Sequence, residues 1–441
     1  MFKYFFLIVT IFSQSFSNSF LNDTTYNFPD STLIISSINF SGNKITKSFI
    51  IEKEMLLKKD SFLTYSKIKY DIGRIYSLEL FNSVKIKVER DSIFAKLEVE
   101  VTERLYFLPY PILSFKDHDI KRFFYGAGFL NNNLNGEHKK INANFATGYD
   151  PFLGFEYEDP YFDTEKNILI AASFYTNIYK NKSLIALEDG ESNFKERWYS
   201  GSIKIGKREN LFTDYSVIIG YSSVNVADYK KGRTVSNNGK DNFPWIKLNY
   251  KYDSRDLKEY ASSGIHYRIE IAKYGVPQTN NNYTRVTYDG KYFFPFNNKS
   301  SFGARTFFSF IEGKEVPFYH KEYFGYWNRF RGHYNEVHEG ENIFLINTEQ
   351  RFSILGPTYF HFDKAPIEQF KDVRTAIYGT VFADFGSAWD RNQNWGKNKI
   401  SGYGVGLNFL AFYSLVLRTE IAFNGERKTA PEFILGIGAS F

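Results

Sequence analysis

The chain has no cysteine among its 441 residues. It therefore has no disulfide framework, and its stability has to come from other contacts. Beyond the N-terminus it also lacks any run of about 18 apolar residues, which excludes a membrane-spanning helix there. The mean hydropathy of −0.38 agrees with that absence.

Catalytic motifs are missing as well. The sequence contains no His-Glu-x-x-His, no Gly-x-Ser-x-Gly elbow and no phosphate loop, so it predicts neither an enzyme nor a cofactor. Its seven histidines are scattered without ligand spacing, which predicts no metal site. The net charge is only +6 and no dense Lys/Arg run occurs, so nucleic acid is not an expected partner.

Aromatic residues, in contrast, are abundant. The chain has 33 Tyr, 47 Phe and 5 Trp, together 19% of its residues. Membrane interfaces select aromatic rings with one polar edge. Combined with the low hydropathy, this composition favours a membrane β-barrel, whose strands are apolar on one face only.

The extreme N-terminus has the layout of a secretory signal peptide. A cationic start at Lys3 precedes an apolar stretch at residues 4–12, and small or polar residues follow. This pattern predicts a signal peptide at residues 1–19. The alternative, a short membrane anchor, requires a longer apolar core. Residues 20–32 are polar and without period, which predicts a linker.

Residues 33–103 show the pattern of a small α+β domain. In its second helix Ile68, Ile72, Ile75 and Leu78 recur every three or four residues, as in an amphipathic helix. The predicted elements, in chain order, are a strand at residues 33–40, helices at 45–57 and 65–80, and strands at 84–89 and 95–102.

From residue 104 to 441 the chain becomes a series of alternating runs. For example, Ile265, Tyr267 and Ile269 alternate with the charged or polar His266 and Arg268. Side chains at every second position of a strand share one face, so the charged set has to face water. The apolar set then faces outward, and about sixteen such runs predict an all-β transmembrane barrel of about 16 antiparallel strands.

The chain ends on such a run. Phe433, Leu435, Ile437, Ala439 and Phe441 alternate with small or apolar residues. We expect a last strand that exposes these side chains on one face and closes against the first strand. Phe433, Leu435, Ile437 and Phe441 are also the predicted C-terminal insertion signal and one side of the barrel seam.

Two motifs lie in the second half of the predicted barrel. The long connection at residues 313–342 contains Phe330, Arg331, Gly332 and His333. A later strand carries Phe-x-Asp-x-Gly, and its parity places the three motif residues, Phe382, Asp384 and Gly386, on one face.

The barrel with these motifs resembles the outer-membrane insertase superfamily, also called the bacterial surface antigen family. The family carries an Arg-Gly pair in its sixth external loop, which folds back into the lumen. It prefers Val or Ile before the Arg and an aromatic residue after the Gly, where this chain has Phe330 and His333. Because a buried guanidinium needs an acidic partner, we expect Arg331 to pair with Asp384 and secondarily with Glu349, an inward position on the preceding strand.

The segment 33–103 resembles a polypeptide-transport-associated (POTRA) domain. The residues that carry this likeness are Gly42 and Asn43 after the first strand, and Leu80, Phe81 and Val84 after the second helix. The resemblance implies a location in the outer membrane of a Gram-negative-type bacterium, with the POTRA domain in the periplasm.

The resemblance also implies a function, assistance in the insertion, assembly or translocation of other outer-membrane polypeptides. Expected partners are the outer-membrane bilayer, unfolded client proteins, and periplasmic chaperones or accessory lipoproteins. Two alternatives remain open. One is a secretion pore for a dedicated exported partner, and the other is a structural surface-antigen barrel.

Overall fold

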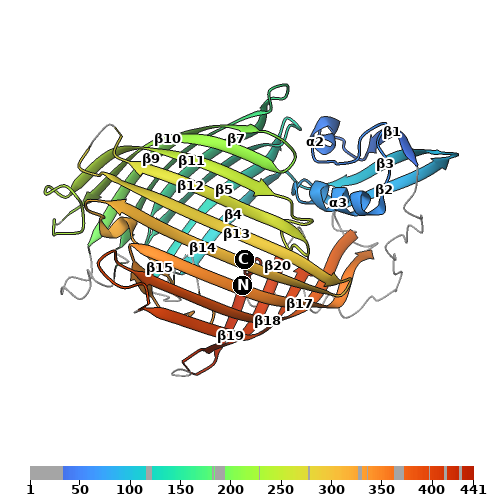
Figure 1. Cartoon of the computed structure of the whole chain (residues 1–441). Coiled ribbons are helices and arrows are strands. Elements are labelled where there is room, and N and C mark those ends of the chain that lie inside the picture. The colour runs from blue at the N-terminus through green and yellow to red at the C-terminus, as the bar shows by residue number, and fades with distance from the viewer. Residues whose placement is uncertain are drawn as a thin grey trace.

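The computed structural model describes residues 33–115, 122–180, 183, 194–227, 229–276, 279–325, 330–334, 336–361, 372–396, 398–411, 415–426 and 430–441. The predicted signal peptide and linker at residues 1–32 lie outside the described residues. The described residues form a small N-terminal domain and a large barrel (Figure 1).

The N-terminal domain has the predicted β-α-α-β-β order. In its sheet the strand order is β1-β3-β2, with β1 parallel and β2 antiparallel to the central β3. The elements are β1 (Ile34–Ser41), α2 (Ser48–Glu52), α3 (Tyr65–Tyr76), β2 (Phe81–Asp91) and β3 (Phe94–Glu103).

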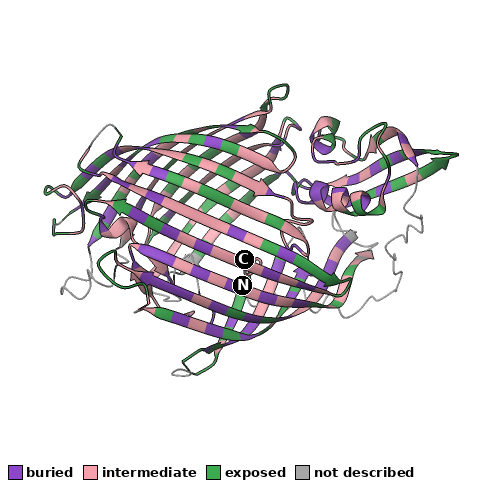
Figure 2. Ribbon diagram, in the orientation of Figure 1, coloured by how far each residue is buried: buried purple, intermediate pink, exposed green. Residues whose placement is uncertain are grey.

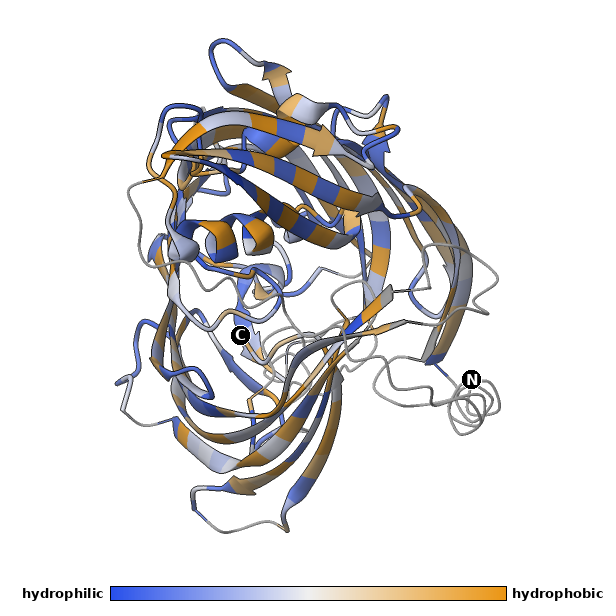
Figure 3. Cartoon of the chain, turned by 90° about the vertical axis from the view of Figure 1, so that its right-hand side faces the viewer, coloured by the Kyte–Doolittle hydropathy of each residue, from blue (hydrophilic) through white to orange (hydrophobic). Residues whose placement is uncertain are grey.

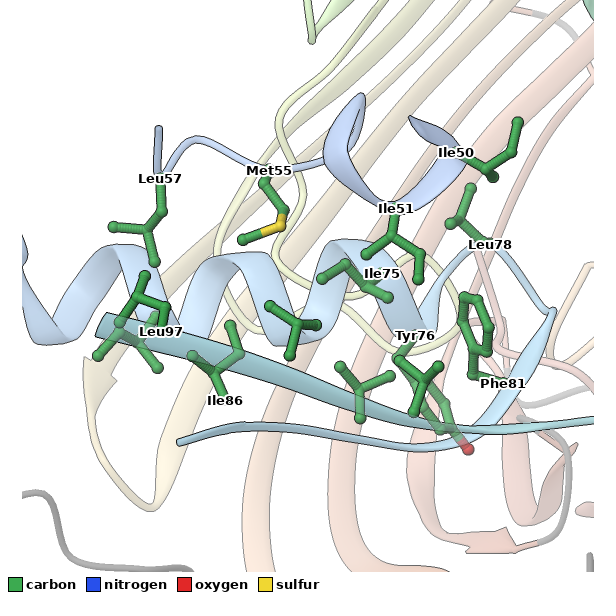
Figure 4. Packing of buried hydrophobic residues seen from close by; sticks show 14 of the residues in the cluster. Ile50, Ile51, Met55, Leu57, Ile75, Tyr76, Leu78, Phe81, Ile86 and Leu97 are labelled. Atoms are coloured by element: carbon green, nitrogen blue, oxygen red, sulfur yellow. The ribbon is translucent and has the colours of Figure 1, made fainter. Parts of the chain in front are cut away.

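One hydrophobic core holds this domain together (Figure 4). Ile68 and Ile75 on α3 pack against sheet residues that include Ile86 and Leu97, all of them buried. The apolar spacing read from the sequence therefore identifies the face of α3 that covers the sheet.

The first helix is much shorter than predicted. The pattern predicted a helix over residues 45–57, whereas α2 has five residues. The reason is tertiary, because the Asp71 carboxylate on α3 accepts hydrogen bonds from the backbone N–H groups of Leu56 (2.8 Å) and Leu57 (3.0 Å). These contacts take the place of helical hydrogen bonds. Burial raises the pKa of Asp71 to about 6.

The barrel consists of one antiparallel sheet of sixteen strands, the number that the alternating runs predicted. Its strands are β4 (Phe107–Phe115), β5 (Phe123–Leu134), β6 (Lys139–Gly148), β7 (Phe152–Asp163), β8 (Ile168–Lys180), β9 (Lys195–Arg208), β10 (Thr213–Val226), β11 (Lys240–Asp253), β12 (Gly264–Tyr274), β13 (Tyr283–Asn297), β14 (Ser300–Gly313), β17 (Asn342–His361), β18 (Asp372–Trp389), β19 (Lys399–Ala411), β20 (Leu415–Asn424) and β21 (Glu432–Ile437). The connection between β14 and β17 holds a short 3-10 helix, η3 (Phe318–His320), and a hairpin of β15 (Glu322–Phe324) and β16 (His338–Gly340).

Exposure alternates along the strands in bands (Figure 2), and so does hydropathy (Figure 3). On β10, Val217, Ile219 and Tyr221 are exposed while Ser216 and Ser222 are buried. The apolar face therefore points outward and the polar face inward, as the sequence predicted. Among the described residues, no helix has the length and hydrophobicity needed to cross a membrane.

The first and last strands differ from expectation. In the sheet order β4 pairs with β5 alone and β21 with β20 alone, and within the described residues no ladder joins β4 to β21. The predicted closure of the last strand on the first is therefore not seen between them. Phe433, Leu435 and Ile437 are 73%, 68% and 77% exposed on the outer face.

The alternation also ends earlier than predicted. β21 stops at Ile437, and Gly438 adopts a φ of +93°, a conformation that side-chain-bearing residues rarely adopt. Beyond it the chain turns inward, so Phe441 is buried against Phe293 and Ala261. The prediction that Phe441 shares the outer face of Phe433 was wrong, because the strand ends before Gly438 and residues beyond this turn no longer alternate between the two faces.

Candidate functional site

Arg331 lies at the centre of a buried cluster of charges inside the barrel. Its Nε and Nη2 atoms each donate to an Asp384 carboxylate oxygen at 2.7 Å, a bidentate pair. Its Nη1 atom donates to Glu349 at 2.9 Å and to Glu420 at 3.3 Å. The predicted contacts with Asp384 and Glu349 are thus present, and Glu420 is a third partner.

The cluster is balanced in charge. Arg351 donates to Glu349 at 2.8 Å, and Arg418 donates to Glu420 at 2.9 Å. With Arg331 and Asp384, three guanidinium groups therefore face three carboxylates. Desolvated charges are tolerated only when paired in this way, and the loss of one member leaves an uncompensated charge.

The two other residues of the Phe-x-Asp-x-Gly motif shape the space for the loop. The ring of Phe382 lies 3.8 Å from the Arg331 guanidinium, a cation–π contact. A Cβ on Gly386 would lie 3.0 Å from the rings of Phe324 and Phe330. Gly386 therefore lets the fully buried Phe330 approach the barrel wall.

A second glycine, on β19, admits the backbone of the same loop. A Cβ on Gly402 would lie 1.9 Å from the Arg331 carbonyl oxygen and 3.3 Å from the Cα of Gly332. Gly402 therefore faces the loop, and its lack of a side chain lets the backbone at Arg331 and Gly332 lie against β19.

The C-terminal tail joins this cluster. Ser440 Oγ donates to Glu349 Oε2 at 2.7 Å, and the guanidinium of Arg351 lies 5.6 Å from the centre of the Phe441 ring. At the other end of β21, both Glu432 carboxylate oxygens accept from the backbone N–H of Tyr334 in the loop. The last strand is therefore held at both of its ends, by the loop at its start and by the charge cluster just beyond its end.

The N-terminal domain is attached to the barrel by a second charge cluster. Glu54, which follows α2, is buried and pairs with Arg74 on α3 at 2.9 Å and with Arg208 of β9 at 2.5 Å. Arg74 also donates to the backbone carbonyl of Asp253, at the end of β11. Burial alone would raise the pKa of Glu54, but Arg208 and Arg74 hold that pKa at about 2.

Hydrogen bonds to backbone carbonyls extend the same interface along the turns between barrel strands. The N–H of Lys47 donates to the Gly136 carbonyl at 2.9 Å, and Lys53 Nζ donates to the Thr164 carbonyl at 3.0 Å. A Cβ on Gly73 of α3 would lie 2.2 Å from the Asp256 carbonyl oxygen, which leaves no room for a side chain. The domain is therefore seated closely on these turns.

Sequence reasoning found part of this arrangement. The motifs pointed to Arg331, Asp384 and Glu349, but not to Glu420, Arg351 or Ser440. The only available signal for Glu420 was its inward parity on a strand near the C-terminus. The histidine spacing predicted no metal site, but the structure brings the ligand atoms of His333, Glu336 and His338 within 4.8 Å of one another.

Taken together, the fold and the two charge clusters define an outer-membrane-type barrel with a docked α+β domain and a loop held inside. The family model "Omp85 superfamily domain" matches residues 133–441, and the POTRA model "Surface antigen variable number repeat" matches residues 33–104. The chain belongs to the Omp85 superfamily. Barrels of this family with POTRA domains are outer-membrane proteins, and their POTRA domains are periplasmic.

Solved structures share the fold. BamA from Haemophilus ducreyi lacking POTRA domains 1–3 matches with a TM-score of 0.53 and 16% identity, over 92% of this chain and 83% of that one. CdiB from Escherichia coli matches with a TM-score of 0.54 and 9% identity, over 92% of this chain and 75% of that one.

Proposed function

We propose that this protein assists the insertion, assembly or translocation of other outer-membrane polypeptides, from the outer membrane and with its POTRA domain in the periplasm. Its partners would be the bilayer and unfolded barrel proteins, with periplasmic chaperones or accessory lipoproteins delivering them. No fuel and no catalytic group is needed for this role, because the contribution of the protein is to offer unpaired backbone groups.

The observation that carries the proposal is the unpaired seam. Within the described residues β4 and β21 have no ladder between them, so each presents a free edge to a strand of a client protein. Pro109 and Pro111 lie in β4 and cannot donate backbone hydrogen bonds. β21 has only six residues. β4 and β21 can therefore form only a few hydrogen bonds with each other.

The charge clusters support the same role. The Arg331 cluster and the Glu432 contact hold β21 from the inside of the barrel. The Glu54 cluster holds the POTRA domain against the turns between barrel strands. A client strand that binds a POTRA sheet edge by β-augmentation would then be at a fixed distance from the seam.

A locked seam tests the proposal. Because the chain has no cysteine, Leu113→Cys on β4 and Leu435→Cys on β21, both outward and exposed, can be joined by a short bifunctional thiol reagent. We expect the joined protein in proteoliposomes to lose insertion of an unfolded outer-membrane barrel protein, and reductive release of a cleavable reagent to restore it.

The matched control joins two strands that already pair. Ile269→Cys on β12 and Tyr288→Cys on β13 face each other in the ladder, and their crosslink should leave insertion unchanged. Full insertion by the seam-locked protein contradicts the proposal. Depletion in cells separates the alternatives: loss of many barrel proteins supports an insertase, loss of one exported protein a secretion pore, and loss of neither a structural role.

A further inference from the structure

Three potential metal ligands meet in the loop beside Arg331. The ligand atoms of His333, Glu336 and His338 lie within 4.8 Å of one another. His333 Nδ1 lies 2.6 Å and His338 Nε2 lies 3.2 Å from the same oxygen, Glu336 Oε2. Within the part of the chain that the structure describes, imidazole nitrogens and a carboxylate oxygen thus converge on one point at these three residues.

The hydrogen bonds of His333 set which of its ring nitrogens faces Glu336. Its Nε2 atom lies 3.2 Å from the carbonyl oxygen of Ser401 on β19. A carbonyl can only accept, so Nε2 carries a hydrogen and Nδ1 is the ring atom that faces Glu336. Nδ1 meets the carboxylate either with a proton, as in an imidazolium, or with its lone pair across a bound cation. Metal-binding histidines show the same arrangement, with the second ring nitrogen donating to a backbone carbonyl.

The three ligands are buried on one side and open to water on the other. His333 is buried, and its ring packs edge-on against Phe330 at 5.7 Å. His338 lies in the β15–β16 hairpin, opposite Phe324. The Glu336 side chain is 40% exposed, so it can shift and water can reach the site. An ion can therefore reach the three side chains from the exposed side of Glu336.

The donor set indicates the class of metal. Two imidazoles and one carboxylate suit Zn²⁺, whereas Ca²⁺ and Mg²⁺ prefer oxygen ligands throughout. With bonds of about 2.0 to 2.1 Å, the ligand atoms of tetrahedral zinc lie about 3.3 Å apart. The 3.2 Å between Glu336 Oε2 and His338 Nε2 fits this value. The 2.6 Å between Glu336 Oε2 and His333 Nδ1 is shorter, so Glu336 would move away from His333 to admit the ion.

We propose that His333, Glu336 and His338 form a binding site for a divalent transition-metal ion, with Zn²⁺ as the best fit. His333 occupies the place where the resemblance led us to expect an aromatic residue, and ligation accounts for the difference. The ion would join the loop to the β15–β16 hairpin directly beside Arg331, and Ser401 would hold the ligand ring against β19.

Cobalt binding to the full chain tests the site. Co²⁺ is added to the refolded, detergent-solubilised protein, and the visible d–d absorption of tetrahedral cobalt is recorded and then displaced with Zn²⁺. We expect one equivalent per chain, and at least a tenfold weaker affinity in His338→Gln and in Glu336→Gln. Heat-dependent gel mobility verifies that each variant has folded.

The control is His266→Gln, which removes one histidine on β12 outside the group of three. This variant should bind cobalt as the unmodified chain does. The proposal is overturned if the unmodified chain binds no stoichiometric Co²⁺ or Zn²⁺. It is equally overturned if His338→Gln and His266→Gln bind alike, because the three residues then form a proton-bridged hydrogen-bond group only.

Discussion

Two buried charge clusters hold this molecule together, and they have opposite signs at their centres. In the lumen one arginine, Arg331, is surrounded by carboxylates. At the domain interface one carboxylate, Glu54, is surrounded by the cations of Arg74 and Arg208. The lumen cluster attaches a loop to the wall of its own barrel, whereas the interface cluster joins two separately packed parts.

This difference has consequences for recognition from sequence. The lumen cluster can be recognised from a short motif, because Phe382, Asp384 and Gly386 follow one another at every second position of one strand. The interface cluster draws on side chains from a helix, a loop and a barrel strand that have no common pattern. The same physical requirement, a partner for each buried charge, is therefore visible in one case and hidden in the other.

Removal of the main partner of Arg331 should have the largest effect. Asp384→Arg places two guanidinium groups together in a buried site, and the loss of one partner of a buried pair costs about 3 to 5 kcal/mol. We expect little folded protein in heat-dependent gel mobility. Arg331→Asp in the same chain should restore part of the folded fraction, and full competence of Asp384→Arg alone would show that the pairing has no role.

The interface cluster should break with less damage to the barrel. Glu54→Gln leaves Arg74 and Arg208 without a carboxylate, so we expect the POTRA domain to separate from the turns while the barrel stays folded, at a cost of about 3 kcal/mol. Distances between spin labels on cysteines introduced in the two parts measure this separation. Glu100→Gln, which removes an exposed pair with Lys87, should leave the distances unchanged.

A steric change sharpens the comparison without altering any charge. Gly402→Ala places a methyl group against the Arg331 carbonyl, and overpacking of this kind costs about 1 to 3 kcal/mol. Urea unfolding of the barrel in detergent should show the loss. Gly379→Ala on β18 is the control, because its nearest contact would be 3.5 Å from a side-chain carbon of Ile354. Equal urea midpoints for Gly402→Ala and Gly379→Ala would show that the loop accommodates the methyl group without loss of stability.

Acid should weaken the interface between the POTRA domain and the barrel, whereas no weakening is expected near neutral pH. The pKa of Glu54 is lowered from 4.5 to about 2 in the docked state, so its contribution is complete above pH 4.5 and is lost as the pH falls toward 2. The spin-label distances should therefore lengthen over this window in the unmodified chain. Glu54→Gln should show no such transition, and a transition of the same size in that variant would assign it to another group.

The sequence predicted the parts of the site that depend on local spacing. Strand parity placed Asp384 and Glu349 inward, and the Arg-Gly pair identified the loop. It could not predict Glu420 or Ser440 as members, because their position depends on strand register and on the turn at Gly438. The short α2 was missed for a similar reason, since Asp71 captures backbone groups that local propensity assigned to a helix.

By itself, the sequence determined the fold class, the number of barrel strands and the face that each strand turns outward, because alternation with a period of two is a local property of the chain. Only the tertiary structure decided what happens at the ends. Whether β4 and β21 pair, and whether Phe441 points outward or inward, depends on the competition between a sheet edge and the buried contacts of the tail. That competition involves residues far apart in the chain, among them Phe293, Glu349 and Arg351.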